Sequence, residues 1–191
     1  VIGLGSGAAA YKVASELGRE FRKMGLKPNA VPSSSQIKFL VSEYYTMIEP
    51  PMAGIDIVID GADEVSSKNN YIIKGGGGAL TRERIIWEMA RERHVFITSE
   101  KIRDKLTHPL PVEVIPFAVN LFQMKLNELG LRWQIRVDKK GYPIFTENGN
   151  IIVDVSYDDQ ADLRSLYEKI KLMPGVLDAG LFIYDVSLHI I

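Results

Sequence analysis

Residues 74–83 read KGGGGALTRE, and residues 56–64, a little earlier in the chain, read DIVIDGADE. Four consecutive glycines leave the first stretch without side chains, so another group can approach its backbone closely. A helix over residues 81–93, with Thr81 as its cap, would carry Glu83 in its first turn. The second stretch predicts a buried strand, because its central residues are apolar and β-branched. We therefore expect four polar side chains from these stretches to converge on one small ligand: Asp60, Asp63, Lys74 and Glu83.

The N-terminal part of the chain shows the same order of strand, turn and helix. Residues 1–4 read as the end of a buried strand, and residues 13–24 carry a helical apolar stripe. The turn between them predicts an anion-binding loop, since the first N–H groups of a helix and its dipole face such a ligand. This turn consists of small residues, namely Gly5, Ser6, Gly7, Ala8, Ala9 and Ala10.

A second strand is predicted at residues 29–32, and three serines follow it, beginning with Ser33. Their hydroxyls suit a sugar or a phosphate, and they equally suit capping of the helix that starts near Gln36. Both roles remain open, and the two are compatible with each other.

Alternating strands and helices predict an α/β fold with a doubly wound, mostly parallel, Rossmann-like sheet. In such sheets ligands bind beyond the carboxyl ends of the strands. We expect the candidate loops to meet at that edge, including the glycine loop after a short strand at residues 71–73 and Lys101 after a strand at residues 94–98.

The pattern changes after about residue 113. Helices at residues 119–129 and 159–170 and strands at residues 132–137 and 151–155 predict a small α+β lobe resembling a ferredoxin. We expect an α/β catalytic domain over residues 1–113 plus 181–191, and a small α+β lobe over residues 114–180.

The composition excludes several classes of function. The chain has 191 residues, 46% of them hydrophobic, and a net charge of -1 that gives no reason to expect nucleic acid or an anionic membrane surface as a partner. It has no cysteine, and its three histidines show no metal-ligand spacing. No apolar stretch reaches the ~20 residues that span a bilayer, and no signal peptide is visible, so we expect a cytoplasmic protein. Val1 lies in mid-strand, and we expect the natural chain to begin upstream of it.

Three carboxylates, one lysine and an anion-binding loop suit proton transfer between adjacent carbons of a phosphorylated sugar, which needs no metal or cofactor. A carboxylate removes the proton beside a carbonyl, and a lysine or N–H groups stabilise the enediolate. The phosphate, held at a distance, supplies binding energy that positions the reacting carbons. The plain alternative is a solvated acidic strand end with a glycine loop that serves only to turn the chain.

Two other functions are open at this point. Residues 5–10 fit the loose pattern G-x-G-x-x-A of a nicotinamide dinucleotide site, but the second strand lacks the acidic residue that holds the ribose. A phosphosugar-sensing module would bind the ligand without turnover, although no helix-turn-helix segment is visible.

Six motifs resemble the type A ribose-5-phosphate isomerase family and occur in the family order over nearly the whole chain. They are GLGSG at residues 3–7, SSS at 33–35, DIVIDGADE at 56–64, KGGGGALTRE at 74–83, PLPVEVIPFA at 109–118 and ENGNIIVDV at 147–155. The resemblance implies an aldose–ketose isomerase that interconverts D-ribose 5-phosphate and D-ribulose 5-phosphate through an enediolate, without metal or cofactor. It also implies the non-oxidative pentose phosphate pathway and a homodimer or homotetramer.

The resemblance assigns roles to individual residues. Glu83 matches the base that moves the proton between C1 and C2, and Lys101 matches a lysine that helps hold the phosphate. The residues that match ring-opening and enediolate-stabilising partners are Asp60, Asp63 and Lys74. The other candidate substrate-binding residues are Gly5, Ser6, Gly7, Ala8, Ala9, Ser33, Gly75, Gly76 and Gly77.

The chain departs from the family pattern at its first turn. The family usually reads G-T-G-S-T there, whereas this chain has Ala8 and Ala9 and so lacks two hydroxyls that touch substrate in the family. Thr98 stands where the family commonly has an aspartate. These departures bear on phosphate affinity more than on the chemistry.

Overall fold

The computed structural model describes residues 1–158 and 160–191, which divide into two compact units. The first unit comprises Val1–Ala62, Arg82–Lys101 and Tyr184–Ile191, and the second comprises Asp63–Thr81 and Ile102–Ile183. A compact unit is not by itself a domain that folds independently. The predicted domains, residues 1–113 plus 181–191 and residues 114–180, therefore stay a prediction.

The first unit is built on a parallel sheet with the strand order β14-β7-β4-β1-β2-β3. Its strands are β1 (Ile2–Leu4), β2 (Asn29–Pro32), β3 (Thr46–Met47), β4 (Ile55–Asp60), β7 (Ala90–Ile97) and β14 (Ser187–Ile190). Ile2 of β1 pairs with both Ala30 of β2 and Ile57 of β4, so β1 lies inside the sheet. The predicted α/β fold with a mostly parallel sheet is confirmed.

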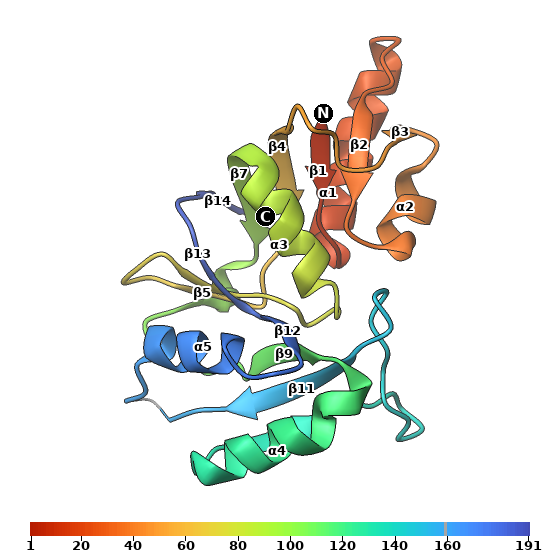
Figure 1. Ribbon diagram of the computed structural model, residues 1–191. Coiled ribbons are helices and arrows are strands. Elements are labelled where there is room, and N and C mark those ends of the chain that lie inside the picture. The colour runs from red at the N-terminus through yellow and green to blue at the C-terminus, as the bar shows by residue number, and fades with distance from the viewer. Residues whose placement is uncertain (159) are drawn as a thin grey trace. The chain divides into compact units, whose positions relative to one another are not determined.

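Three helices accompany this sheet: α1 (Ala8–Lys23), α2 (Ser35–Val41) and α3 (Leu80–Met89). Figure 1 shows α1 and α3 on opposite faces of the sheet, as right-handed crossovers to the two sides of β1 require. The core between α1 and the sheet contains Ile2, Leu4, Ala14 and Ile59, with Leu17 packed against it. Because the strands are parallel, the residues after β1, β2 and β4 lie at one edge.

The helix after the glycine loop is shorter than the sequence predicts. The expected helix covers residues 81–93, but α3 ends at Met89 and β7 begins at Ala90. Glu92 and Arg93 pair with Ile57 and Val58 of β4. The charged residues 91–93 are as compatible with a helix as with a strand. Their pairing with β4, which is distant in the sequence, decides that they form a strand.

The second unit contains an antiparallel sheet with the order β10-β11-β9-β12. Its strands are β9 (Leu110–Val114), β10 (Arg132–Ile135), β11 (Ile151–Ser156) and β12 (Val176–Ala179), and its helices are α4 (Val119–Glu128), α5 (Leu163–Lys171) and the short η2 (Pro116–Ala118). Val112 and Val153 pack with Phe122 of α4 and Ile170 of α5 in one core. The expected start of the last helix at Asp159 lies outside the described residues, and Asp162 caps α5.

A further sheet of the second unit has the order β13-β6-β5-β8. It comprises β5 (Glu64–Ser66), β6 (Tyr71–Ile73), β8 (Ile102–Arg103) and β13 (Leu181–Ile183). The short strand before the glycine loop forms where the sequence predicts it, but it pairs antiparallel with β5 and β13. The expectation that the glycine loop follows a strand of the parallel sheet is therefore wrong, because a tight turn after β5 sends the chain back along β5.

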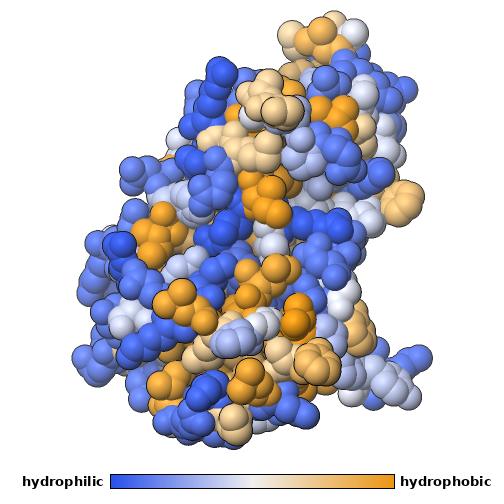
Figure 2. Space-filling view, viewed as in Figure 1, coloured by the Kyte–Doolittle hydropathy of each residue, from blue (hydrophilic) through white to orange (hydrophobic). Residues whose placement is uncertain are grey.

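The surface mixes polar and apolar side chains, and Figure 2 shows both kinds over α4 in the lower part of the view. Near this helix Phe117 is 99% exposed and Met124 is 51% exposed. Within the described residues, the helices are too short or too polar for any of them to traverse a lipid bilayer.

Candidate active site

The ends of β1 and β2 bring a group of serines together in the first unit. The Ser33 N–H donates to the Leu4 carbonyl at 2.8 Å, which joins the two loops. The Ser6 hydroxyl lies 2.7 Å from the Ser33 hydroxyl and donates to that of Ser34 at 2.9 Å. Ser34 also caps α2 by accepting the Ile37 N–H. Ser34 thus takes the expected capping role, and Ser6 and Ser33 form a hydroxyl pair at the strand ends. That these hydroxyls bind a sugar or a phosphate stays a prediction.

Glu83 lies in the first turn of α3, as the sequence predicts, and its side chain is buried. Its Oε1 accepts a hydrogen bond of 3.2 Å from the Ser6 N–H. The turn after β1 leads into α1, and Gly7 is the N-cap residue of that helix. Glycine has no side chain, so no side-chain hydrogen bond caps the first turn of α1. A carboxylate therefore sits beside uncapped N–H groups that can bind an anion.

Asp60 ends β4 and is completely buried. Its Oδ1 accepts the Gly61 N–H at 2.7 Å, and its Oδ2 accepts the indole N–H of Trp87 at 2.8 Å. A Cβ on Gly5 would overlap this carboxylate, so the turn after β1 needs glycine at that position. Sequence reasoning missed Trp87. The sequence could have indicated Trp87 by its position four residues after Glu83, because that spacing puts both side chains on one helix face.

Lys101 belongs to a single helical turn, η1 (Ser99–Lys101), that follows β7. Its Nζ donates to the Ala62 carbonyl at 2.7 Å. The ammonium group therefore lies against the Ala62 carbonyl, just after β4 at the edge of the parallel sheet, where the sequence predicts it.

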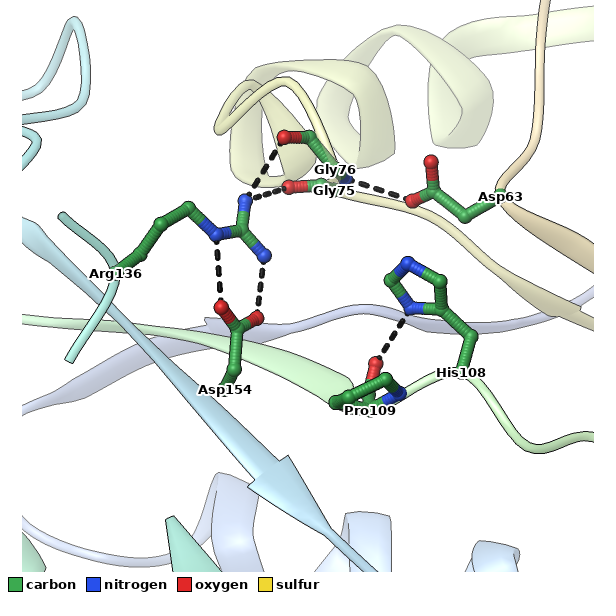
Figure 3. Close-up of polar contacts among 7 residues, drawn as sticks. All are labelled: Asp63, Gly75, Gly76, His108, Pro109, Arg136 and Asp154. Atoms are coloured by element: carbon green, nitrogen blue, oxygen red, sulfur yellow. Dashed lines mark hydrogen bonds and ion pairs between the residues drawn. The ribbon is translucent and has the colours of Figure 1, made fainter. Parts of the chain in front are cut away.

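In the second unit the glycine loop contacts Asp63, as Figure 3 shows. The Gly76 N–H donates to Oδ2 of Asp63 at 2.7 Å. A Cβ on Gly76 would overlap the Asp63 carboxylate, so this glycine is needed for a close approach and not only for turning. The turn itself is closed by Gly78, whose N–H donates to the Gly75 carbonyl at 2.9 Å.

Lys74 precedes this loop and is almost fully buried in the second unit. Its N–H donates to the Gly180 carbonyl at 2.9 Å. Its Nζ lies 5.7 Å from the centre of the Phe182 ring, a distance at which a cation is attracted to the ring face. The backbone and the ammonium of Lys74 are thus both held by the chain near β13.

Sequence reasoning also missed Arg136, although the family motif at residues 147–155 contains its partner Asp154. The Nη1 of Arg136 donates to the carbonyl of Gly75 at 2.6 Å and to that of Gly76 at 3.0 Å, and its Nε donates to Asp154 at 2.9 Å (Figure 3). The contacts with the glycine loop join positions 60 and 61 residues apart, and no local pattern reveals them.

The structure brings the predicted residues together as two sets, one in each unit. The first set lies at the edge of the parallel sheet and comprises Gly5, Ser6, Gly7, Ala8, Ala9, Ser33, Asp60, Glu83 and Lys101. The second surrounds the glycine loop and comprises Asp63, Lys74, Gly75, Gly76 and Gly77. That both sets act on one ligand stays a prediction.

These groups are suited to acid–base chemistry on an anionic substrate. Buried carboxylates can move protons, and an ammonium and backbone N–H groups can stabilise negative charge on oxygen. Among residues 1–158 and 160–191, histidine, aspartate and glutamate side chains form no cluster of three or more that is arranged to hold a metal ion.

Comparison with known sequences gives a consistent result. The sequence model of the family described as ribose 5-phosphate isomerase A (phosphoriboisomerase A) matches residues 29–191. Ribose-5-phosphate isomerase A of Thermosynechococcus vestitus is 40% identical over 189 residues, which cover 96% of this chain and 80% of that protein. The enzyme of the same name from Thermoplasma acidophilum is 37% identical over 185 residues, 95% of this chain and 76% of that protein.

Solved structures agree with the sequence comparison. Ribose 5-phosphate isomerase A from Methanocaldococcus jannaschii superimposes with a TM-score of 0.91 at 37% identity, covering 98% of this chain and 84% of that chain. A D-ribose-5-phosphate isomerase in complex with phospho-erythronic acid gives a TM-score of 0.89 at 32% identity, covering 97% and 83%. The similarity therefore extends over both units.

Proposed function

Because the chain belongs to the ribose 5-phosphate isomerase A family, it is an aldose–ketose isomerase of ribose 5-phosphate and ribulose 5-phosphate, and we propose that Glu83 is its base. The hydrogen bond from the Ser6 N–H to the Glu83 carboxylate carries this assignment. It seats a buried carboxylate beside a turn that is suited to an anion. A substrate held by its phosphate at that turn would bring its carbons within reach of Glu83.

The proposed reaction begins with the open-chain aldose, whose aldehyde is at C1. Glu83 removes the proton from C2, and the electron pair moves to form an enediolate with its charge on O1. A proton then moves from O2 to O1, and Glu83 returns its proton to C1, which leaves a ketone at C2 and a hydroxyl on C1. Proton transfer by a positioned carboxylate typically contributes a factor of about 100 to 10,000 in rate.

The remaining polar residues are proposed to act on the same substrate. Asp60 and Asp63 move hydroxyl protons during ring opening and between O1 and O2, and Lys74 with the glycine-loop N–H groups stabilises the enediolate. The proposed phosphate ligands are the Ser6 and Ser33 hydroxyls, the N–H groups after Gly7, and Lys101. The serine pair and the uncapped helix turn support this assignment.

Isotope exchange tests the base directly. Wild-type protein incubated with ribose 5-phosphate in D₂O is expected to form ribulose 5-phosphate with deuterium on carbon. Glu83→Gln is expected to lower turnover and exchange at least about 100-fold while the phosphosugar still binds. Glu88→Gln, a change of the same kind at an exposed position of α3, is the control.

Two results would contradict the proposal in different ways. Turnover by Glu83→Gln at a rate near that of the wild type would show that another group is the base. Binding of ribose 5-phosphate by the wild type without turnover would instead favour the phosphosugar-sensing module.

We also propose that the enzyme works in the cytoplasm, in the non-oxidative pentose phosphate pathway, as a homodimer or homotetramer. The exposed apolar residues Ile115, Phe117 and Met124 offer a surface for a second copy. Light scattering of the wild type and of Phe117→Asp tests the assembly, and a monomeric wild type would refute it.

A further inference from the structure

We propose that Arg136, held by Asp154, is a positioning residue that orients the peptide groups of the glycine loop toward Asp63 and the substrate. The inference rests on the proposed function, because it takes the glycine loop to contact the reacting sugar. It concerns a pair of residues that the reaction scheme above does not use.

The guanidinium of Arg136 is fixed on one side by β11. Its Nε donates to Oδ2 of Asp154 at 2.9 Å, and its Nη2 is bonded to the other carboxylate oxygen. The Arg136 N–H donates to the Ile152 carbonyl at 2.9 Å, so the backbone is fixed as well. The Arg136 and Asp154 side chains are only 15% and 23% exposed. A two-point pair of this kind sets both the position and the plane of the guanidinium.

The remaining nitrogen, Nη1, reaches the glycine loop. It donates to the carbonyl of Gly75 at 2.6 Å and to the carbonyl of Gly76 at 3.0 Å. Two successive carbonyl groups of the loop therefore face the same NH₂ group, as Figure 3 shows. Since glycine has the greatest backbone freedom, the contact with Arg136 adds to the hydrogen bond from the Gly78 N–H in holding one orientation of these peptides.

The geometry of the peptide unit extends this contact across the loop. In a planar trans peptide the C=O and the following N–H point in opposite directions. The Gly75 carbonyl faces Arg136, so the Gly76 N–H points away from it and meets Asp63 at 2.7 Å. By the same geometry, the Gly76 carbonyl faces Arg136 and directs the Gly77 N–H away from it. Arg136 thereby turns two N–H groups toward the side of the loop that Asp63 occupies.

The charge of Arg136 adds to this effect. A cationic donor on a carbonyl polarises the peptide and makes its N–H a stronger donor. N–H groups that are already oriented before the reaction stabilise a developing oxyanion without reorganisation. Arg136 would therefore favour the enediolate through the Gly77 N–H and fix the Asp63 carboxylate through the Gly76 N–H. It contacts neither the base nor the sugar itself in this scheme.

The competing explanation is that Arg136 and Asp154 only join β10 to β11. In that case their loss lowers stability but leaves kcat of the folded protein unchanged. The test is Arg136→Met in the full chain, with Arg132→Met as the control, because Arg132 is an exposed arginine at the start of β10.

We expect Arg136→Met to lower kcat for ribose 5-phosphate at least about 10-fold. This decrease is smaller than the decrease in kcat that follows removal of an oxyanion donor itself. KM should change less than 3-fold, since the phosphate ligands are elsewhere, and millimolar guanidinium ion should restore part of kcat. Arg136→Lys should be intermediate, because it keeps the charge but loses the two-point pairing. Arg132→Met should behave as the wild type.

A second measurement does not depend on catalysis. The Gly76 amide proton is hydrogen-bonded to a carboxylate. In the absence of substrate, its NMR resonance should therefore move upfield in the Arg136→Met variant and stay in place in the Arg132→Met variant. An unchanged kcat together with an unmoved Gly76 resonance would overturn the proposal. Should Arg136→Met not fold, Asp154→Asn allows the same comparisons. An inactive wild type would contradict the proposed function alone, because the Gly76 resonance still tests the orientation.

Discussion

The indole N–H of Trp87 donates a hydrogen bond of 2.8 Å to Oδ2 of Asp60, and both side chains are completely buried. The Trp87 ring also packs edge-on against Tyr184, with 5.5 Å between the ring centres. Helix α3 therefore contributes Glu83 and, one turn later, the donor that fixes a second candidate carboxylate. The Glu83 and Trp87 side chains lie on one face of the helix because the two residues are four positions apart.

Replacing Trp87 by phenylalanine keeps an aromatic ring but removes the donor to Asp60. We expect Trp87→Phe to lower the free energy of unfolding by about 2 kcal/mol, the usual loss for a hydrogen bond to a charged group. kcat should fall as well, because the carboxylate of Asp60 is no longer held. Urea denaturation and steady-state kinetics measure the two effects.

The control for this prediction is Trp133→Phe in the second unit. Its indole donates to the Asn127 side chain at 2.9 Å near the surface, so its loss should cost less and leave kcat unchanged. If Trp87→Phe matched the wild type in both stability and kcat, the indole would not be holding Asp60.

Much of the fold follows from local sequence patterns. The strand at Asn29–Pro32 and the strand at Tyr71–Ile73 form at the predicted residues, because runs of apolar and β-branched residues between turns favour strands. The end of α3 and the partner strands of β6 were predicted wrongly. Both depend on pairing with strands far along the chain, and local propensity does not contain that information.

The candidate site divides in the same way. Glycine runs and strand-end carboxylates, such as Gly76 and Asp60, were identified from residue type and position. Their supports, Trp87 and Arg136, were not, because each contact joins residues 27 or 61 positions apart. A tryptophan or an arginine has many possible roles, and only the folded chain selects one.

The approach of Gly76 to Asp63 leads to a second prediction. Gly76→Ala should lower kcat at least 10-fold, because the added Cβ must displace the Asp63 carboxylate. Gly77→Ala is the comparison, since a Cβ there meets no atom within 4 Å among the described residues, and its loss of kcat should be smaller. Equal losses in the two variants would show that steric overlap with Asp63 is not the cause.

Glu113 gives a third prediction, on stability. It is completely buried and accepts hydrogen bonds from Thr81 at 2.5 Å, Thr146 at 2.7 Å and Asn150 at 2.9 Å. Glu113→Gln replaces one acceptor oxygen by a donor that faces these donors. We expect a loss of about 1–3 kcal/mol in the free energy of unfolding, measured by urea denaturation.

An exposed glutamate is the control for Glu113. Glu128 pairs with Lys125 on the surface of α4, and Glu128→Gln should change the free energy of unfolding by less than about 1 kcal/mol. Similar values for both variants would mean that the buried acceptors of Glu113 contribute no more than a surface ion pair.

Glu64 gives a prediction on pH. Burial raises the pKa of this carboxyl, but hydrogen bonds from the His108 and Thr107 N–H groups and the Thr107 hydroxyl outweigh it, so the pKa lies below its ordinary value of 4.5. A lowered pKa in the folded state stabilises the protein above the unfolded-state pKa, and this stabilisation is lost as the pH falls through the folded-state pKa. Glu64→Gln should therefore be less stable than the wild type at pH 7, and the difference should shrink below about pH 4.5. Denaturation curves at pH 3 to 7 measure this, and a difference that is constant with pH would contradict it.

The turn after β1 gives the last prediction. Ala8, the first residue of α1, lines a pocket together with Gly7, Tyr11 and Ile37. Ala9 is the next residue of α1. Ala8→Ser and Ala9→Thr together would add two hydroxyls where the chain now offers only backbone N–H groups. If the phosphate binds at this turn, each new hydrogen bond contributes about 0.5–1.5 kcal/mol. KM for ribose 5-phosphate should then fall about 2-fold to 10-fold for each hydroxyl that bonds, while kcat stays unchanged because the base and its partners are untouched.

Ser6→Ala is the matched opposite change, and it should raise KM by removing a hydroxyl from the same turn. An unchanged KM in both the added-hydroxyl and the Ser6→Ala variants would place the phosphate elsewhere.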